Sequence, residues 1–300
     1  MKLSFFQESR IGGRSYNQDR QVIAHSREAV MLVVADGMGG HLQGEVAAQI
    51  TIDLMSELFY QQATPGLSHP NRFLVNAISS THQAILDYAA DQRLPEIPST
   101  TVVAAIIQQG MLSWCHVGDS RLYLLDKQGM RLRSRDHSQV QRLIDQGKLT
   151  EEGARTHPDR NKIYNCLGAT SDPDIDIGEK QTLQAGVSIV LCSDGLWSQI
   201  SDSEMEKVFI GRSVGQVMPA LMNVAERRAG SSGDNLSAVA ITLLDDAAEV
   251  AGRADALDTV VTPPRHSGRV ILDPNLELMH QEILASRVAA PSGKPGQDGR

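Results

Sequence analysis

Residues 31–48 read MLVVADGMGGHLQGEVAA and pass from an apolar run through a glycine-rich turn into a helical pattern. The β-forming run from Met31 to Ala35 ends on Asp36, because an apolar strand cannot bury an unpaired charge. Gly37 follows and lets the backbone approach a neighbour closely or adopt a positive φ. Two readings fit an acid at this place. It helps to hold a hard cation with carboxylate and carbonyl oxygens, or it caps the following helix.

The composition is that of an acidic chain of 300 residues with a formal net charge of −8, long enough for one large or two small domains. The negative charge and the lack of long basic runs argue against a nucleic-acid partner. Three cysteines without a CxxC pair are typical of a reducing compartment. We see no signal peptide and no run as long as a membrane span, so we expect a cytoplasmic protein without a membrane partner.

Hydrophobic periodicity predicts strands and then two long helices in the first third of the chain. The strands are expected near residues 3–9, 20–26 and 29–35. Apolar residues four apart from Val46 to Leu58 predict the first helix, and a second apolar stripe predicts another over 71–89.

The middle of the chain is dominated by predicted strands with very short links. They are expected over residues 100–108, 111–119 and, as a hairpin, 121–133. Such short links require antiparallel pairing, because parallel strands need a long crossover. Two more strands near 187–192 and 236–244 enclose helices, the first of which has Ser201 and Glu204 at capping-box spacing. Separate blocks of helices and strands favour an α+β fold.

The composition also suggests how the domain is organised. Within residues 137–186, the stretch 138–149 predicts a helix that Gly147 ends, and residues 155–179 are polar and irregular. We interpret residues 137–186 as an inserted mobile segment outside the core. Residues 246–300 are small, polar and charged, which predicts a disordered tail. We therefore expect one domain over residues 1–245 followed by the tail.

Acids at the ends of apolar strands recur along the chain. Asp36, Asp119 and Asp194 each end such a run, and Asp234 precedes another. Gathered at one rim of the sheets, these carboxylates would repel one another unless cations lay between them. Oxygen ligands without His or Cys favour Mg²⁺ or Mn²⁺ over zinc. For each acid taken alone, a turn residue is the alternative.

An acidic site filled with divalent cations suits a phosphate ester. Two metal ions can activate a shared water and neutralise charge on the phosphoryl oxygens. An arginine that orients the phosphate is expected as well, because its planar fork matches phosphate oxygens. Arg14 follows a Gly-Gly turn, but the pattern alone does not favour it over Arg121. An ordinary surface arginine is the alternative.

Motifs in a fixed order give the chain a family resemblance. They are RSYNQD, VVADGMGGHLQGEVAA, STTVVAAII, VGDSRLYLL, RDHS, THPDRNKIYNCLG, LCSDGLW and GSSGDNLSAVAI. Over about residues 1 to 245 the chain resembles the metal-dependent serine/threonine phosphatases of type 2C, the PPM family, in its compact bacterial form. The resemblance implies a sandwich of two antiparallel sheets with a helix pair on each outer face (αββα). It also implies a metal centre at one end and a flap over residues 137–186 beside it.

The resemblance also implies a role for each acid. Asp36 would bridge two ions, and the carbonyl of Gly37 would be a further ligand. Asp194 and Asp234 would complete the coordination of the second ion. Asp119 matches the acid that shares a weaker third ion with Asp194 in bacterial relatives.

Arg14 matches the phosphate-binding arginine of the family. The resemblance implies direct attack on phosphorus by a metal-bridging hydroxide, without a phosphoenzyme. This agrees with the sequence, in which no activated Cys, Ser or His nucleophile is evident. The implied substrates are phosphoserine and phosphothreonine proteins, with a cognate serine/threonine kinase as the opposing enzyme. We expect a monomer.

Two positions depart from the family pattern. Gln18 stands where many members have Glu, and as a neutral side chain it adds no charge to the metal site. Met38 stands where animal members have a His that is a proposed general acid. The nearest histidine, His41, could protonate the leaving oxygen, cap the following helix or bond to Asp36. A metal-bound water is another proton donor.

Two other functions remain as alternatives. One is a catalytically silent relative that binds phosphoproteins, which the complete set of acids disfavours. The other is a metal-dependent phosphodiesterase or nuclease, which the acidic charge disfavours. Structural roles are expected for several residues outside the acid set. His116 is interpreted as a satisfied sheet histidine, His137 and His157 as local structure at the flap edges, and Trp114 and Trp197 as core.

Overall fold

The structure, a computed structural model, describes residues 2–39, 43–154 and 156–244. The chain divides into two compact units, Met1–Val260 and Val261–Arg300. The second unit and the expected tail over 246–300 lie outside the described residues. The disorder and the domain boundary expected there therefore stay predictions.

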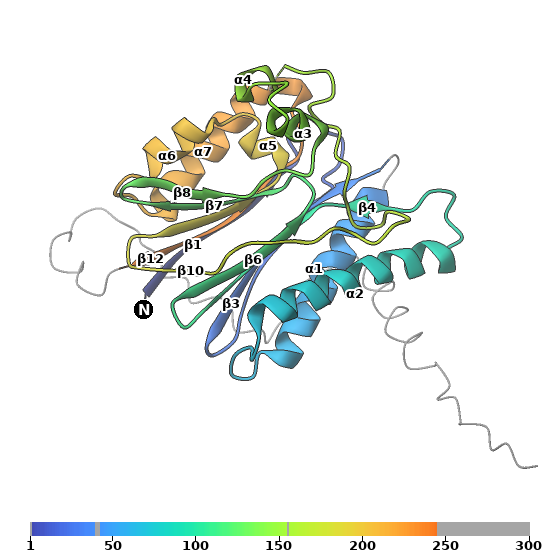
Figure 1. Ribbon diagram of the computed structural model, residues 1–300, viewed down its shortest axis with the longest axis horizontal. Coiled ribbons are helices and arrows are strands. Elements are labelled where there is room, and N and C mark those ends of the chain that lie inside the picture. The colour runs from blue at the N-terminus through green and yellow to red at the C-terminus, as the bar shows by residue number, and fades with distance from the viewer. Residues whose placement is uncertain (1, 40–42, 155, 245–300) are drawn as a thin grey trace, which may run out of the picture. The chain divides into compact units, whose positions relative to one another are not determined.

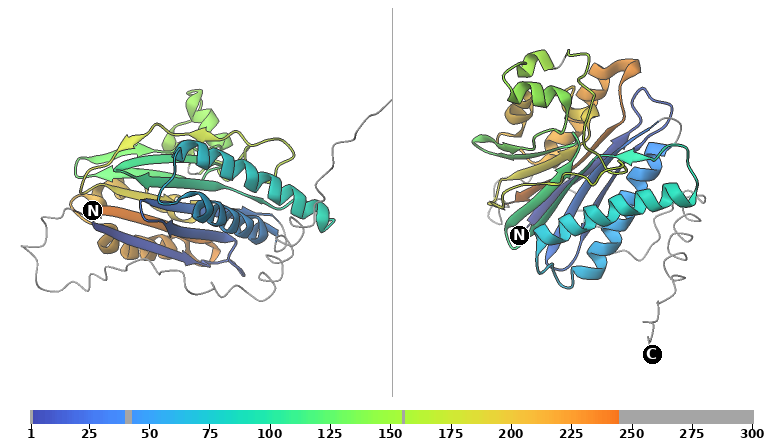
Figure 2. Two further views of the ribbon diagram at one scale, coloured as in Figure 1. Left: turned by 90° about the horizontal axis from the view of Figure 1, so that it is seen from below. Right: turned by 45° about the vertical axis from the view of Figure 1, so that its right-hand side comes forward.

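Two antiparallel β-sheets lie face to face (Figures 1 and 2). The first sheet has the order β1 (Lys2–Arg10), β12 (Leu236–Leu244), β11 (Ser188–Cys192), β7 (Arg121–Asp126) and β8 (Gly129–Arg133). The second has the order β10 (Gln181–Thr182), β6 (Met111–Val117), β5 (Val102–Gln108), β3 (Ala29–Met38) and β2 (Asp19–His25). The short β4 (Ser99–Thr100) pairs with β3, and β9 (Asp176–Ile177) pairs with β6. The predicted α+β fold with two antiparallel sheets is confirmed.

Helices cover the outer face of each sheet (Figure 1). The second sheet carries α1 (Gln43–Gln62) and α2 (Pro70–Asp91). The first sheet carries α6 (Asp202–Phe209) and α7 (Val214–Ala229), with the short α5 (Asp194–Trp197) beside them. None of the described helices combines the length and apolar character that a membrane crossing requires.

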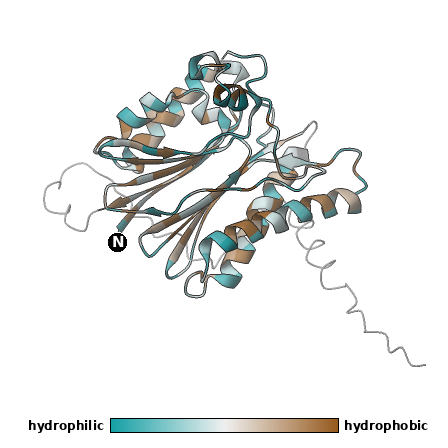
Figure 3. Cartoon of the chain, viewed as in Figure 1, coloured by the Kyte–Doolittle hydropathy of each residue, from teal (hydrophilic) through white to brown (hydrophobic). Residues whose placement is uncertain are grey.

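The position of β3 between two cores explains its continuous apolar sequence. Met31 and Val33 pack into the core beneath α1 and α2, whereas Leu32 and Val34 pack into the core between the sheets. Because successive side chains of a strand point to opposite faces, a strand covered on both faces is apolar at every position. Figure 3 shows this apolar character along the strands of both sheets. Each fully buried side chain of this kind contributes about 1.5–3 kcal/mol.

The end of β3 lies later in the chain than predicted. The strand passes through Asp36 and Gly37 to Met38, because β4 pairs with these last residues, Gly37 opposite Thr100. A Cβ atom on Gly37 would lie 2.2 Å from the carbonyl oxygen of Gly44 in the first turn of α1. The glycine is therefore required by the close approach of strand and helix.

Local signals set the ends of the later helices. At α6 the Ser201 hydroxyl accepts a hydrogen bond from the Glu204 N–H, and the Glu204 carboxylate accepts one from the Ser201 N–H. This is the predicted capping box. Gly230, with φ of 64°, follows the end of α7 as expected for a residue that takes a left-handed conformation.

The inserted segment contains more ordered structure than its composition indicates. It holds α3 (Gln139–Asp145), α4 (Glu151–Ala154), β9 and β10. Leu167 is fully buried in the core beneath α1 and α2, and its backbone exchanges two hydrogen bonds with Thr100. The helix predicted over residues 138–149 is therefore confirmed by α3, whereas the interpretation of the segment as lying outside the core was wrong for Leu167. A few apolar residues and two edge strands attach the segment to the sheet.

Candidate metal centre

The predicted acidic residues lie at one end of the sandwich. Asp36 stands near the end of β3 and Asp119 follows β6, and both strands run antiparallel to β5, so they end at one edge. Asp194 follows β11 and Asp234 precedes β12, which pair antiparallel and share an edge as well. The two edges meet, since Asp194, Asp119 and Asp234 all act electrostatically on Asp36.

Burial and mutual repulsion make these carboxyls hard to ionise. Burial, followed by the charges of neighbouring acids, raises the pKa of Asp36 and of Asp194 well above the ordinary value of 3.8. Burial is also the main reason that the pKa of Asp119 rises to about 7, and the charge of Asp136 adds to it. A cation among these groups would favour their charged forms.

One oxygen in the cluster lacks a hydrogen-bond partner. Asp194 Oδ1 is buried and makes no hydrogen bond to any described residue. A buried carboxylate oxygen without a partner is costly, and a divalent cation is a suitable partner. The set consists of carboxylate oxygens without nitrogen or sulfur, which fits Mg²⁺ or Mn²⁺. The residues present therefore fit the ions that the resemblance implies.

Thr101 links the backbone of Asp36 to the residue that follows Asp119. Thr101 N–H donates to the Asp36 carbonyl at 2.9 Å, and its hydroxyl accepts from the Asp36 N–H at 3.2 Å. The same hydroxyl lies 2.7 Å from the Ser120 hydroxyl, next to Asp119. Trp197 Nε1 donates to the Asp119 carbonyl at 2.9 Å. These bonds hold Asp36 and Asp119 in place independently of a metal.

Arg14 reaches the acids from the loop after β1. Its Nη2 donates to Asp234 Oδ2 at 2.6 Å, and this bond is the main reason that the Arg14 pKa is raised. The loop lies close to the chain before β12, because a Cβ atom on Gly12 would lie 2.1 Å from the Asp234 carbonyl oxygen. The Arg14 side chain is 56% exposed. It therefore lies at the metal end of the sandwich and is open to a ligand.

Arg121 has a different environment. Its Nε and Nη2 donate to the two carboxylate oxygens of Asp136 at 2.8 and 2.7 Å, and its guanidinium lies 3.6 Å from the ring centroid of Trp197. Both members of the pair are buried. The two arginines between which the sequence pattern did not choose therefore have different environments in the structure. Arg121 lines the same cleft as Arg14, but its guanidinium is buried and paired with Asp136. Trp197 packs against the core of the first sheet, as expected, and also lines the cleft.

Replacing Arg121 with methionine is expected to lower the free energy of unfolding by about 3–5 kcal/mol, because it leaves the Asp136 carboxylate buried without a partner. Urea denaturation measures this. The exposed Arg131 on the neighbouring β8 is a matched control, and Arg131→Met should change stability by less than roughly 0.5 kcal/mol. Equal effects of the two substitutions would show that the buried pair is not structural.

A cleft of about 1130 Å³ connects the acids with the inserted segment. Arg14, Asp194 and Asp234 line one part of it, and Glu151 and Arg160 of the inserted segment line another. A substrate large enough to fill the cleft from the acids outward would therefore also contact the inserted segment.

The sequence profile of the family described as protein phosphatase 2C matches residues 6–229. The chain belongs to the protein phosphatase 2C family. The resemblance seen in the motifs is thereby confirmed, and membership makes the chain a hydrolase. The matched range contains Arg14, Asp36, Asp119 and Asp194 and ends just before Asp234.

Similar proteins share both the sequence and the fold of this phosphatase. The serine/threonine phosphatase stp of Listeria innocua is 34% identical over 199 residues, which are 66% of this chain and 75% of that protein. The crystal structure of the Mycobacterium tuberculosis serine/threonine phosphatase PstP/Ppp has a TM-score of 0.71 and 31% identity, over 82% of this chain and 100% of that chain. A structure of the PstP catalytic domain in complex with two manganese ions has a TM-score of 0.69 and 30% identity, over 81% and 99%.

One acid of the phosphatase was missed in the sequence. Asp19 begins β2 opposite Asp36, and its Oδ2 accepts a hydrogen bond from the Ser193 hydroxyl at 2.7 Å. Its Oδ1 is buried and makes no hydrogen bond to a residue that the structure describes, and burial raises its pKa to about 6. Asp19 thus connects the two sheets at the metal end. The sequence did contain a signal for Asp19, because this acid ends the motif RSYNQD and precedes a predicted strand, as Asp234 precedes another.

Two further residues considered at the predicted site are His41 and Gln18. His41 lies outside the described residues, so its role as a general acid stays a prediction. Gln18 is described, and its side-chain amide lies 3.4 Å from the Gly39 carbonyl, while its N–H donates to Asn235. It therefore bonds to the backbone of the loop after β3.

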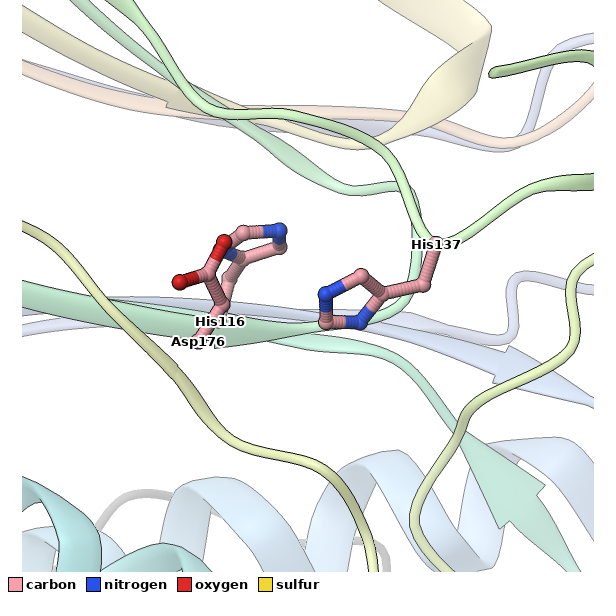
Figure 4. Close-up of side chains that lie close together, drawn as sticks. All are labelled: His116, His137 and Asp176. Atoms are coloured by element: carbon pink, nitrogen blue, oxygen red, sulfur yellow. The ribbon is translucent and has the colours of Figure 1, made fainter. Parts of the chain in front are cut away.

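A second group of possible metal ligands lies at the edge of the second sheet. His116, His137 and Asp176 point toward one another (Figure 4), and each offers one ligand atom within 4.8 Å of the others. The expectation that His116 is fully satisfied was wrong. Its Nε2 bonds to the Arg135 carbonyl at 2.8 Å, but its Nδ1 is buried and has no hydrogen-bond partner among the described residues.

Hydrogen bonding at His137 argues against a metal at this second place. The Nδ1 atom of His137 accepts from the Gly118 N–H at 3.1 Å and from Asn165 Nδ2 at 2.7 Å. Nδ1 is therefore the unprotonated nitrogen, and Nε2 carries the proton. A protonated Nε2 is a donor and has no lone pair for a metal, so we assign the group no ion.

Proposed function

We propose that this phosphatase removes phosphate from phosphoserine and phosphothreonine in proteins with the help of two Mn²⁺ or Mg²⁺ ions. The observation that carries the proposal is the group of acids at one end of the sandwich, with an unpartnered oxygen on Asp194 and with Arg14 beside them. The names of the relatives, serine/threonine phosphatases, support the substrate class.

The proposed ligands are divided between the ions as the family resemblance implies. Asp36 would bridge the two ions, the Gly37 carbonyl would be a further ligand, and Asp194 and Asp234 would complete the coordination of the second ion. Asp119, whose carbonyl accepts from Trp197 Nε1 and whose neighbour Ser120 bonds to Thr101, would bind a weaker third ion together with Asp194. Asp19 is in contact with this set through Ser193 and would orient it.

Hydrolysis by direct attack of water fits the groups in the cleft. When bound, the ions supply a nucleophile at neutral pH and neutralise charge on the phosphoryl oxygens. Among the described residues, Cys115 and Cys192 are buried, and burial raises the pKa of both thiols. Neither thiol lines the cleft. Neither thiol is therefore placed to form a phosphoenzyme, and we propose that water displaces the serine or threonine oxygen from phosphorus directly.

Arg14 is the proposed phosphate-binding residue. Its exposed guanidinium lies beside Asp234 and in the wall of the cleft, where it can orient the phosphoryl oxygens. An enzyme with this activity would oppose a serine/threonine kinase, and we propose that it works as a cytoplasmic monomer.

Replacing Arg14 with lysine is expected to lower kcat/KM for a phosphothreonine peptide roughly 10- to 100-fold, because a charge-assisted hydrogen bond of about 1.5–3 kcal/mol is lost. Steady-state kinetics at saturating Mn²⁺ measure this. Arg27→Lys in the exposed turn before β3 is the matched control and should leave kcat/KM unchanged. An Arg14→Lys enzyme with wild-type kinetics would remove Arg14 from the phosphate site.

The experiment that tests the function is phosphate release from a phosphothreonine peptide by the purified protein. Release with Mn²⁺ and none with EDTA is expected. Calorimetry with Mn²⁺ alone, run beside it, separates the possible failures. Bound metal without release would favour the silent phosphoprotein-binding relative, and no bound metal would reject the metal centre itself.

A further inference from the structure

We propose that His137, at the start of the flap (the inserted segment, residues 137–186), is a positioning residue. Its Nδ1 atom holds the Asp119 turn, which is Gly118 and Asp119, and also holds the later part of the flap. The inference rests on the proposed function, in which Asp119 binds a metal ion. It differs from the prediction that His137 only supports local structure at the edge of the flap.

His137 binds both backbone polar groups of the residue before Asp119. The Gly118 N–H donates to His137 Nδ1 at 3.1 Å, and the Gly118 carbonyl accepts from the His137 N–H at 3.0 Å. That carbonyl belongs to the peptide unit that leads into Asp119, so the second bond sets the direction of this residue. Because the Gly118 position is tight and has φ of 103°, the turn has little freedom to compensate for the loss of these bonds.

The same nitrogen binds the flap. Asn165 Nδ2 donates to His137 Nδ1 at 2.7 Å and to the Asp174 carbonyl at 2.7 Å. Asn165 Oδ1 accepts from the Asp174 N–H at 3.2 Å, which determines how the amide is oriented. The Tyr164 N–H also donates to the His137 carbonyl at 3.0 Å. Two stretches of the flap, at Tyr164–Asn165 and at Asp174, are thus attached to the residue that holds the Asp119 turn.

This arrangement requires a lone pair on His137 Nδ1. Both of its partners there, the Gly118 N–H and the Asn165 amide, are donors, so a proton on Nδ1 would place N–H groups against each other. The remaining nitrogen, Nε2, carries the proton, and the ring stacks on that of His116 with 4.6 Å between the ring centroids, in the group with Asp176 (Figure 4). A test of this role therefore compares a substitution that keeps a hydrogen-bond acceptor at the position of Nδ1 with one that removes it.

Two substitutions separate this role from packing. In His137→Asn, the side-chain oxygen comes near the position of Nδ1 and keeps the acceptor. In His137→Gln, the longer amide reaches the position of Nε2 and the Nδ1 acceptor is lost. Gln is closer to His in length, so a simple packing role predicts the opposite order of damage.

Mn²⁺ calorimetry on the full chain is the first measurement. The weaker class of bound Mn²⁺ should be absent in Asp119→Asn. We expect His137→Gln to weaken that class roughly 10- to 100-fold, as for other residues that orient metal ligands, and His137→Asn to stay near wild type. Hydrogen exchange of the Gly118 amide should accelerate in the Gln variant alone. Circular dichroism confirms that each variant is folded.

A separate substitution tests the link to the flap. Asn165→Ala should raise KM for a phosphoprotein and leave KM for a small aryl phosphate unchanged, because only the larger substrate contacts the flap. The proposal is overturned if His137→Gln binds the weaker Mn²⁺ as wild type does, if the Asn and Gln variants behave alike, or if Asp119→Asn loses no class of ion. A wild-type protein that binds Mn²⁺ but releases no phosphate would refute the proposed function, while the calorimetry would still decide the role of His137.

Discussion

Replacing Asp36 with asparagine is expected to lower kcat/KM for a phosphothreonine peptide by roughly 10³-fold, since in the proposed metal centre it would remove a ligand and several kcal/mol of metal-based charge stabilisation. The same substitution should raise the Tm of the metal-free protein. Neighbouring carboxylates and burial raise the pKa of Asp36 well above its ordinary value, so a neutral amide at this position relieves an unfavourable charge. Phosphate release and thermal denaturation in EDTA measure the two effects.

Opposite signs for activity and stability distinguish a metal ligand from a structural acid. Asp194→Asn should behave in the same way, because burial and the charges of Asp119 and Asp234 also raise its pKa. Asp87→Asn on the exposed face of α2 is the matched control and should alter neither quantity. An Asp36→Asn protein that loses activity and stability together would indicate a folding defect instead of a lost ligand.

In the absence of divalent metal, the Tm of the wild type is expected to fall as the pH rises from about 5 to 8. Burial raises the pKa of Asp19 to about 6 and of Asp119 to about 7, above the ordinary 3.8. A carboxyl with a raised pKa binds more protons in the folded state. Its stabilising contribution is therefore complete at low pH and is lost as the pH passes through the folded pKa.

Mn²⁺ is expected to reverse this dependence. At pH 8, free Mn²⁺ at roughly 100 times its Kd should stabilise the protein by about 2.7 kcal/mol, a Tm increase of roughly 5–10 °C. The increase should be smaller at pH 6, because protons compete with the metal for the carboxylates.

Buried histidines act in the opposite direction, since burial lowers the pKa of His137 to about 4. Comparing the wild type with Asp194→Asn at each pH removes their contribution. The Tm deficit of the metal-free wild type relative to this variant should grow with pH. A deficit that stays constant from pH 5 to 8 would contradict the raised pKa values in the acid cluster.

Periodicity was sufficient for most of the fold because the long elements are regular. The continuous apolar run that gives β3 two buried faces, and the stripe along α1, are properties of neighbouring residues. Elements attached by few contacts were harder to predict. The strands β9 and β10 have two residues each and pair with the edge of β6, so no pattern of their own announces them.

The candidate site was predictable to the extent that each acid carried a local signal. Asp36, Asp119, Asp194 and Asp234 stand at the ends of apolar runs beside Gly or Asn, and all belong to one cluster in the structure. Asp19 carried a weaker form of the same signal and was passed over. Its importance depends on Ser193, which is distant in the sequence and belongs to the other sheet.

By itself, the sequence determined the layers of the fold, the family and the acids at the strand ends, because strand and helix periods and short motifs are local. Only the tertiary structure showed that Arg14 is exposed whereas Arg121 is buried in an ion pair, and only the tertiary structure revealed the bonds of His137. Those roles depend on which distant groups meet: Asp234 beside Arg14, Asp136 beneath Arg121, and Gly118 with Asn165 at one nitrogen of His137. Burial and hydrogen-bond geometry set these pairs, and neither is encoded in the spacing of residues along the chain.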